Sequence, residues 1–120
     1  MKRTIMTADI AMLAITGASS ANAMTPKTVN YTCQGGKSIN VKYFFNKQNL
    51  PTKAQAKLAG KMRIMPINLA HSSVTGTTFG KAGSYMIGTD HVDATTYNQV
   101  TLSTVTAPNN KIIYKECRPN

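Results

Sequence analysis

The amino-acid sequence predicts an all-β fold: a small eight-stranded antiparallel β-barrel that follows an N-terminal signal peptide and is closed by one disulfide. Short segments in which apolar and polar residues alternate recur along the chain, and a period of two is that of a strand with one buried face. Turn residues separate these segments at intervals of roughly 8 to 12 residues, which is typical of sandwiches and barrels. The two cysteines, Cys33 and Cys117, lie in the first and last segments.

Residues 1–23 have the composition of a secretory signal peptide. The second and third residues are basic, residues 10–15 are apolar, and the triplet Ala-Asn-Ala that ends at Ala23 has the pattern of a cleavage site. Cleavage near Ala23 would leave residues 24–120 as a single domain in the periplasm, at the cell surface or secreted. The alternative is that the apolar run forms a buried helix of the domain. No other segment approaches the ~18 to 20 apolar residues of a transmembrane helix.

The two cysteines are expected to form a disulfide, because an exported chain matures in an oxidising compartment. A bridge between Cys33 and Cys117 closes a long loop, and a loop of this length corresponds to roughly 4 kcal/mol of stabilisation. A small domain has limited apolar burial, so a covalent link of this size is a large part of its stability.

Four strands are expected in the first half of the domain. They are residues 28–33, 38–45, 53–59 and 62–67. The second is the clearest, since its apolar residues from Ile39 to Phe45 occupy alternate positions. Glycines before it suit a tight turn, and the loop 46–51 follows it.

The segment 53–67 has two interpretations. As two strands, it places Ala54, Ala56 and Leu58 on one face, turns at a glycine, and ends near Pro66, which suits an edge strand. The alternative is an amphipathic helix, because alanine, glutamine and lysine are good helix formers. The alternation favours the strands.

Four more strands are expected in the second half, after the polar stretch 68–77. They are residues 77–81, 84–89, 98–106 and 111–117. The first two flank a glycine turn, the loop 90–93 follows them, and the third is rich in β-branched residues. In a closed barrel the last strand returns to the first, which would bring Cys117 to Cys33.

The domain is strongly basic. Without the first 23 residues it holds 12 lysines and arginines against 3 acids, a formal charge of +9. This charge favours anionic partners, such as polymers of the host-cell surface, although the lysines are spread along the chain and equally fit a solubilising surface. No nucleic-acid partner is expected, since no dense basic run is present.

The inventory of catalytic groups is poor. The acids are Asp90, Asp93 and Glu116, and the histidines are His71 and His91. An enzyme needs groups that exchange protons or attack as nucleophiles, so no catalytic residues are expected. The cluster around His91 is more typical of a solvated turn than of a metal site, which leaves no expected metal or cofactor.

Nine segments of the domain match those of a known family. They are 29–33, 36–37, 43, 45–50, 60–61, 65–69, 78–85, 106–108 and 115–120, which together cover nearly the whole domain. In these segments the chain resembles the neisserial adhesin complex proteins, which are related to the periplasmic and membrane-bound inhibitors of c-type lysozyme. The resemblance implies the eight-stranded barrel of those inhibitors and two activities, inhibition of host lysozyme and adhesion to host cells.

The resemblance also implies part of a lysozyme-binding site. The inhibitors present a loop with a Ser-Gly and Tyr pattern, which Gly83, Ser84 and Tyr85 resemble here. Their second motif, a later Lys-Gly pair, has no counterpart, because no lysine occurs between Lys81 and Lys111. We therefore expect contact through the loop region around 80–93.

Lys81 is expected to reach the catalytic carboxylates of lysozyme together with Ser84. Asp90 and Asp93 follow in the same region, where they would meet the basic surface of lysozyme and offset repulsion between two cationic proteins. The alternative is that Asp90 and Asp93 cap a turn and that Lys81 is solvated.

Overall fold

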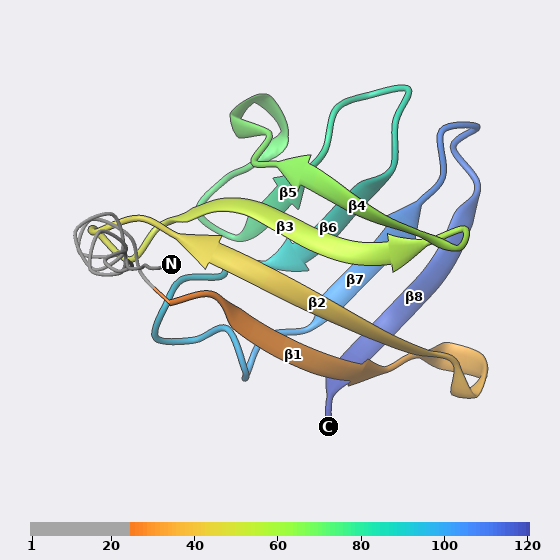
Figure 1. Cartoon of the computed structure of the whole chain (residues 1–120), viewed down its shortest axis with the longest axis horizontal. Helices are drawn as coiled ribbons and strands as arrows, with labels where there is room; N and C mark the ends of the chain where they lie inside the picture. The colour runs from red at the N-terminus through yellow and green to blue at the C-terminus, as the bar shows by residue number, and fades with distance from the viewer. Residues whose placement is uncertain (1–24) are drawn as a thin grey trace, which may run out of the picture.

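The computed structural model describes residues 25–120 and shows eight antiparallel strands wound into a nearly closed barrel (Figure 1). The strands are β1 (Lys27–Thr32), β2 (Ser38–Phe45), β3 (Pro51–Leu58), β4 (Lys61–Pro66), β5 (Gly76–Phe79), β6 (Met86–Asp90), β7 (Leu102–Thr106) and β8 (Ile112–Pro119). Their spatial order is β4-β3-β2-β1-β8-β7-β6-β5. The predicted fold is confirmed, and the predicted signal peptide, residues 1–23, lies outside the described residues.

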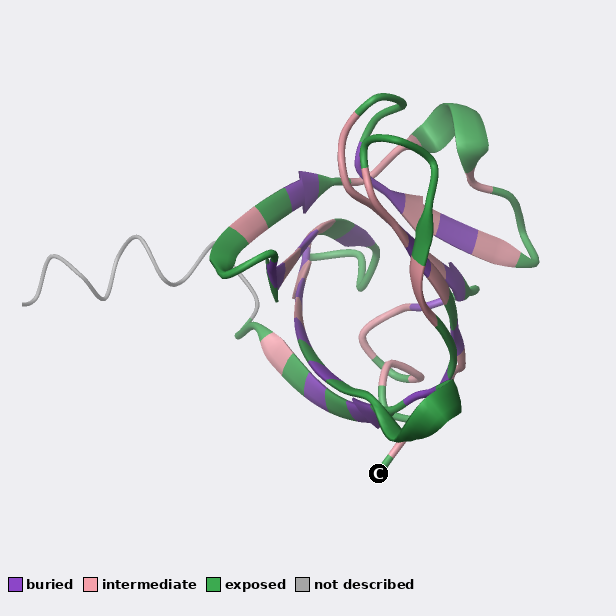
Figure 2. Cartoon of the chain, turned by 90° about the vertical axis from the view of Figure 1, so that its right-hand side faces the viewer, coloured by how far each residue is buried: buried purple, intermediate pink, exposed green. Residues whose placement is uncertain are grey.

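The first four strands form a meander, in which each strand pairs with the next along the chain. The strand interpretation of 53–67 is confirmed, because β3 and β4 pair throughout and are joined by Ala59 and Gly60, both with positive φ. Alternate residues of β2 and β3 are buried, among them Val41, Ala54 and Ala56. Figure 2 views the barrel from one end and shows this alternation of buried and exposed residues along the strands.

The second half departs from the prediction at three strands. The strand expected at 77–81 ends earlier and the strand expected at 84–89 begins later, since β5 ends at Phe79 and β6 begins at Met86, so residues 80–85 form a loop. The expected strand 98–106 begins only at Leu102, because residues 93–100 fold into successive turns. Those turns are closed by backbone bonds from Tyr97 to Asp93 and from Gln99 to Thr96. Local side-chain bonding to the backbone outweighs the β-propensity of this stretch.

The barrel encloses one hydrophobic core. Ile39, Val41, Phe45 and Leu102, which the alternation predicts to be inward, are all buried. Tyr43 packs against Phe79, with ring centroids 5.7 Å apart. Two short 3-10 turns, η2 (Gln34–Gly36) and η3 (Leu69–His71), lie outside this core.

Two tyrosines share a hydrogen bond inside the core. The hydroxyl oxygens of Tyr31 and Tyr43 lie 2.6 Å apart, and both residues are 0% exposed. Burial raises the pKa of Tyr31 to about 12, and it raises the pKa of Tyr43 well above 10.0. Both phenols are therefore neutral at physiological pH, and each supplies the polar partner that the other needs in an apolar surrounding.

The strands β1 to β4 and β5 to β8 form two halves that meet at two seams. At the first, which we call the disulfide seam, β1 pairs with β8 through only two residue pairs, and the predicted bridge joins Cys33 to Cys117. At the second, which we call the open seam, β4 faces β5 and the loop 80–85. The open seam is closed at one end by the bridge between Ile67 and Phe79.

Candidate functional site

The loop 80–85 is fixed to the end of β4 by Gly80. The N–H of Gly80 donates to the carbonyl of Pro66 at 2.7 Å, and its own carbonyl accepts from the amide of Asn68 at 2.8 Å. A Cβ at this position would lie 2.2 Å from the carbonyl oxygen of Tyr85, and the φ angle is +94°. Only glycine fits this conformation, so Gly80 sets the position of the residues that follow it.

The loop then makes a tight turn that presents three polar side chains. The N–H of Ser84 donates to the carbonyl of Lys81 at 3.0 Å, and Gly83 adopts a φ of +86° at the tip of the turn. Lys81 is exposed, whereas Ser84 and Tyr85 are half-buried against β4. The turn therefore holds a lysine, a hydroxyl and an aromatic ring beside the open seam.

Arg63 of β4 joins this group from the other side of the seam. Its guanidinium carbon lies 4.3 Å from the centroid of the Tyr85 ring, and its Nε donates to the carbonyl of Leu58 at 2.9 Å. A cation over an aromatic face is attracted by the ring electrons, and here both contacts hold the planar guanidinium in one orientation. Its terminal nitrogens make no ion pair with any residue in 25–120.

These residues line a groove between β4 and the loop. The groove has a volume of about 390 Å³. Its lining residues are Arg63, Ile64, Met65, Pro66, Gly80, Lys81, Ser84 and Tyr85. Two cations, a hydroxyl and an aromatic ring in a partly desolvated groove can bind carboxylates, because charge-assisted hydrogen bonds are strengthened when water is excluded.

The acidic residues of the predicted site lie at the opposite end of β6. Asp90 is the last of the five residues of β6, which begins directly after the loop 80–85, and an extended strand of that length covers about 16 Å. The structure therefore brings Lys81, Ser84 and Tyr85 together but does not bring Asp90 or Asp93 into the same groove.

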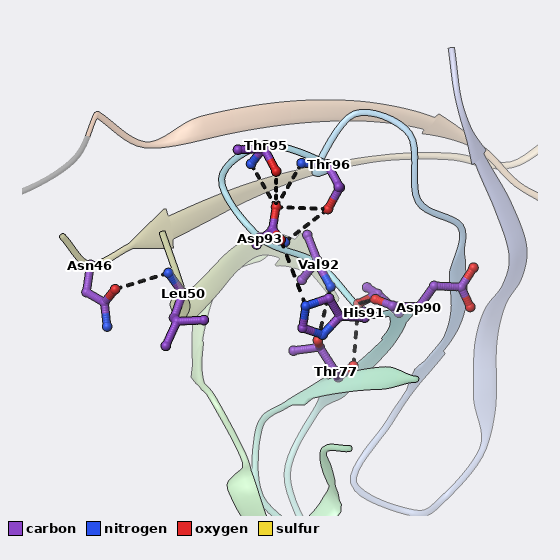
Figure 3. A network of polar contacts seen from close by, with 10 residues as sticks. Asn46, Leu50, Thr77, Asp90, His91, Val92, Asp93, Thr95 and Thr96 are labelled. Atoms are coloured by element: carbon purple, nitrogen blue, oxygen red, sulfur yellow. Dashed lines mark hydrogen bonds and ion pairs between the residues drawn. The ribbon is translucent and has the colours of Figure 1, made fainter. Parts of the chain in front are cut away.

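Asp93 forms the centre of a network of polar contacts (Figure 3). Its Oδ1 accepts hydrogen bonds from the backbone N–H and the hydroxyl of Thr95, at 2.8 and 2.7 Å, and of Thr96, at 3.0 and 3.1 Å. The bonds from Thr95, followed by those from Thr96, lower the pKa of Asp93 below its ordinary 3.8. Its Oδ2 lies 3.9 Å from the Nε2 of His91. The carboxylate is thus engaged in organising its own turn.

The turn around Asp93 is tied to neighbouring elements. The N–H of Val92 donates to the hydroxyl of Thr77 at 3.2 Å, and the N–H of Ala94 donates to the carbonyl of Asn49 at 3.0 Å. Val92 is fully buried, whereas the side chain of Asp90 is exposed. Asp90 is therefore the more available of the two carboxylates for a partner.

Arg63 is the residue that sequence reasoning missed. It occupies an inward position of β4, two residues before the buried Met65. A charged residue on the core face of an alternating strand is a signal in itself, because such a residue must find a polar partner or line an opening. Its proximity to Tyr85 depends on how β4 meets a loop more than 15 residues later in the chain, which the strand pattern does not specify.

Within residues 25–120 no group of three or more histidine, cysteine, aspartate or glutamate side chains is placed to hold a metal ion. The same part of the chain contains no helix that is long and apolar enough to span a membrane.

Comparisons with known proteins agree with the fold. Residues 27–119 match the family model described as ACP-like domain. Among solved structures, the chain is similar to the Adhesin Complex Protein from Neisseria meningitidis, with 44% sequence identity and a TM-score of 0.74, over 79% of this chain and 100% of that one. No match was found among curated proteins.

Proposed function

The chain belongs to the ACP-like domain family, and from this we propose that it is an exported surface protein that adheres to host cells and inhibits c-type lysozyme of the host by occupying its active-site cleft. The name of the solved relative supports the adhesive role, since the two sequences are 44% identical across the full length of that chain. The signal-like segment 1–23 supports export to the periplasm or the cell surface, or secretion.

The observation that supports lysozyme inhibition is the pair of cations in the groove. Glycosidases of this type act through two carboxyl groups in a cleft. Arg63 and Lys81 line the same groove, and Ser84 adds a hydroxyl to the lining. A guanidinium can bind a carboxylate with two parallel hydrogen bonds, and Lys81 adds a second point of positive charge.

Arg63 also offers an explanation for the motif that this sequence lacks. The resemblance implies a second cation from a later Lys-Gly pair, and none is present between Lys81 and Lys111. Arg63 comes instead from an earlier strand, and Tyr85 holds it beside the loop that carries the first motif. We infer that Arg63 takes the place of the missing lysine.

Asp90 and Asp93 have a separate part in this proposal. They lie outside the groove, but an interface of standard size would be wide enough to include both the groove and these two acids. Asp90, which is exposed, would contact the basic surface of lysozyme and offset part of the repulsion between two cationic proteins.

A turbidity assay with bacterial cell walls, human lysozyme and the mature protein tests inhibition. We expect Arg63→Met and Lys81→Ala each to weaken inhibition about tenfold, which corresponds to about 1.4 kcal/mol of binding free energy. The matched control is Lys111→Ala, an exposed cation on the β7–β8 turn that lies away from the groove lining. Full lysozyme activity in the presence of a micromolar excess of the protein would exclude inhibition.

The double change Asp90→Asn with Asp93→Asn tests the acidic contribution in the same assay. We expect it to weaken inhibition by a smaller factor than Arg63→Met, because exposed charges mainly affect the rate of association. An unchanged inhibition constant would remove both acids from the binding surface.

Adhesion without inhibition is the second candidate, and the charge distribution favours it. After Ala23 the chain has 12 lysines and arginines. Within residues 25–120 none of them forms an ion pair with a carboxylate, and the pair found there joins His91 to Asp93. Such a surface attracts anionic polymers of the host-cell surface. Salt-sensitive retention on heparin, together with loss of host-cell binding in a strain lacking the protein, is the expected result; elution at low salt would count against it.

A further inference from the structure

The strand β4 has a free edge from Lys61 to Ile64, which is four of its six residues. A two-residue turn, Ala59 and Gly60, joins β3 to β4 and pairs Leu58 with Lys61. Because the residue pairs of an antiparallel ladder are alternately hydrogen-bonded, the backbone groups of Lys61, Arg63 and Met65 point toward β3. The backbone groups of Met62 and Ile64 therefore face the other way, into the open seam. No backbone hydrogen bond from either residue to another element is found within residues 25–120.

The facing edge of β5 is covered by the chain itself. The N–H of Thr78 donates to the hydroxyl of Ser72 at 3.0 Å, and its carbonyl accepts from the N–H of Asn68 at 2.7 Å. The seam closes at Pro66, whose carbonyl accepts from Gly80. Beyond that point the loop 80–85 contacts β4 through side chains, and no backbone hydrogen bond joins it to Met62 or Ile64. Sheet edges are usually protected from pairing with other chains. At the open seam the edge of β5 is protected, whereas the edge of β4 from Lys61 to Ile64 is not.

The side chains along the free edge divide into two rows. Met62 and Ile64 point outward and are 60% and 59% exposed. Arg63 points inward, over Tyr85 and toward the groove that Lys81 also lines. A strand added at this edge would place alternate side chains beside the apolar row and beside the cationic row.

We propose that the free edge of β4 binds, by strand addition, an extended acidic polypeptide segment whose residues are alternately apolar and acidic. The backbone of the segment would complete the hydrogen bonds of Met62 and Ile64, its carboxylates would face Arg63 and Lys81, and its apolar side chains would cover the outer row. Main-chain bonds provide affinity in this mode of recognition, and the alternating side chains provide specificity.

Charge argues for an acidic segment rather than a second copy of this chain. In a symmetric antiparallel pair in which Met62 faces Ile64 of the other copy, Arg63 would lie directly opposite its own counterpart, and like charges in that position are destabilising. The domain also carries a formal charge of +9, which opposes self-association. An acidic segment would instead be attracted both by Arg63 and by the net positive charge of the domain.

The test is a titration of the mature protein with a labelled eight-residue peptide of alternating valine and glutamate, followed by fluorescence anisotropy. Two control peptides are matched to it: one carries N-methyl groups on alternate backbone nitrogens, and one has lysine in place of glutamate. We expect saturable binding of the first peptide, at least tenfold weaker binding of the N-methylated peptide, and no binding of the lysine peptide.

Protein variants separate the edge from the charge. Ile64→Pro removes the N–H that faces the seam without removing a bond to β3, and we expect it to weaken binding at least tenfold. Ile64→Ala keeps that N–H and should weaken binding less than threefold. Arg63→Met should weaken binding about tenfold. In the unsubstituted protein, the amide hydrogens of Met62 and Ile64 should exchange more slowly when the peptide is bound.

Equal binding of the N-methylated peptide, or unchanged exchange at Met62 and Ile64 in the presence of saturating peptide, would overturn the proposal and leave a cationic surface that binds any polyanion. Both measurements use the unsubstituted protein, so they remain decisive if Ile64→Pro does not fold. Lysozyme is absent from them, and a failure here leaves the inhibition proposal to its own assay.

Discussion

The disulfide seam and the open seam join the same two halves of the barrel by different means. The disulfide seam has a ladder of only two residue pairs, and the bond between Cys33 and Cys117 makes it permanent. The open seam has no covalent link among the described residues, closes at the bridge of Ile67 with Phe79, and leaves a groove of about 390 Å³ beyond it.

The difference shows how a small barrel can keep an opening. A covalent closure on one side stabilises the fold mainly by restricting the unfolded chain. The other side can then present unpaired cations and a free strand edge, which would be costly in a domain held by its core alone. We therefore expect the open seam, where polar groups lack partners, to serve function. We expect the disulfide seam to serve stability.

Removing the disulfide should have the largest effect. We expect the double change Cys33→Ser with Cys117→Ser to lower the free energy of unfolding by roughly 4 kcal/mol, because it opens a loop of 84 residues. Thermal unfolding measured by circular dichroism should then show a melting temperature lower by about 20 °C. A melting temperature within a few degrees of the original would mean that pairing of β1 with β8 suffices by itself.

Truncating Phe79 should show what closes the open seam. Its side chain is fully buried and packs on Tyr43, so Phe79→Ala should cost about 3 kcal/mol in chemical unfolding. The control is Leu50→Ala, since Leu50 is 49% exposed and such a change is expected to cost about 0.5 kcal/mol or less. Similar losses for the two variants would contradict the role of packing at this seam.

Alkaline pH should weaken the core beside the disulfide seam. The raised pKa values of Tyr31 and Tyr43 mean that unfolding releases protons above the ordinary tyrosine pKa of 10.0. Their contribution is complete below that value and is lost as pH rises toward the folded pKa, about 12 for Tyr31. We expect the free energy of unfolding to fall by about 1 kcal/mol or more between pH 9 and pH 11.

Guanidinium titrations at pH 9 and pH 11 measure this effect, and Tyr31→Phe is the comparison. The variant should be less stable at pH 9, because the hydroxyl of Tyr43 loses its partner, but it should lose less between the two pH values. The same dependence on pH in both proteins would place the responsible groups elsewhere.

The smallest effect is expected at Asp93, which follows the end of β6 that lies away from the groove. Asp93→Ala should cost about 1 kcal/mol at pH 7, because the N–H groups of Thr95 and Thr96 lose their acceptor. The contribution of the charge is present above the ordinary pKa of 3.8 and is lost as pH falls through the lower folded pKa. The two proteins should therefore converge at acidic pH.

Asp93→Asn is the control for that prediction, since it keeps an acceptor oxygen and removes the charge. It should lie between the original protein and Asp93→Ala at pH 7. If the difference between the original protein and Asp93→Ala were as large at pH 2 as at pH 7, the charge would not contribute.

The local pattern of the sequence was sufficient for most of the fold. The alternation from Ile39 to Phe45 predicts the buried face of β2, and the glycines predict the turns, because both depend on interactions between near neighbours. The predicted start of the strand 98–106 was wrong, because β7 begins only at Leu102. The side chain of Asp93 stabilises a series of turns before it, and the β-propensity of the stretch does not reveal them.

The candidate site was only partly predictable. Lys81, Ser84 and Tyr85 are near neighbours in the chain, and the turn that joins them brings them to one groove. Asp90 and Asp93 are also close in sequence to this loop, yet the extended strand β6 places them at the other end of the barrel. Nearness in sequence therefore predicts nearness in space across a turn but not along a strand.

The sequence by itself determined the all-β class, the number and order of the strands and the pairing of the cysteines, because strand faces and turns follow from short-range chemistry and the chain has two cysteines. Only the tertiary structure decided that Arg63 lies over Tyr85 and that the edge of β4 stays free. Which strand edges meet, and how completely, depends on the twist and register accumulated over all eight strands, and no single segment encodes that sum.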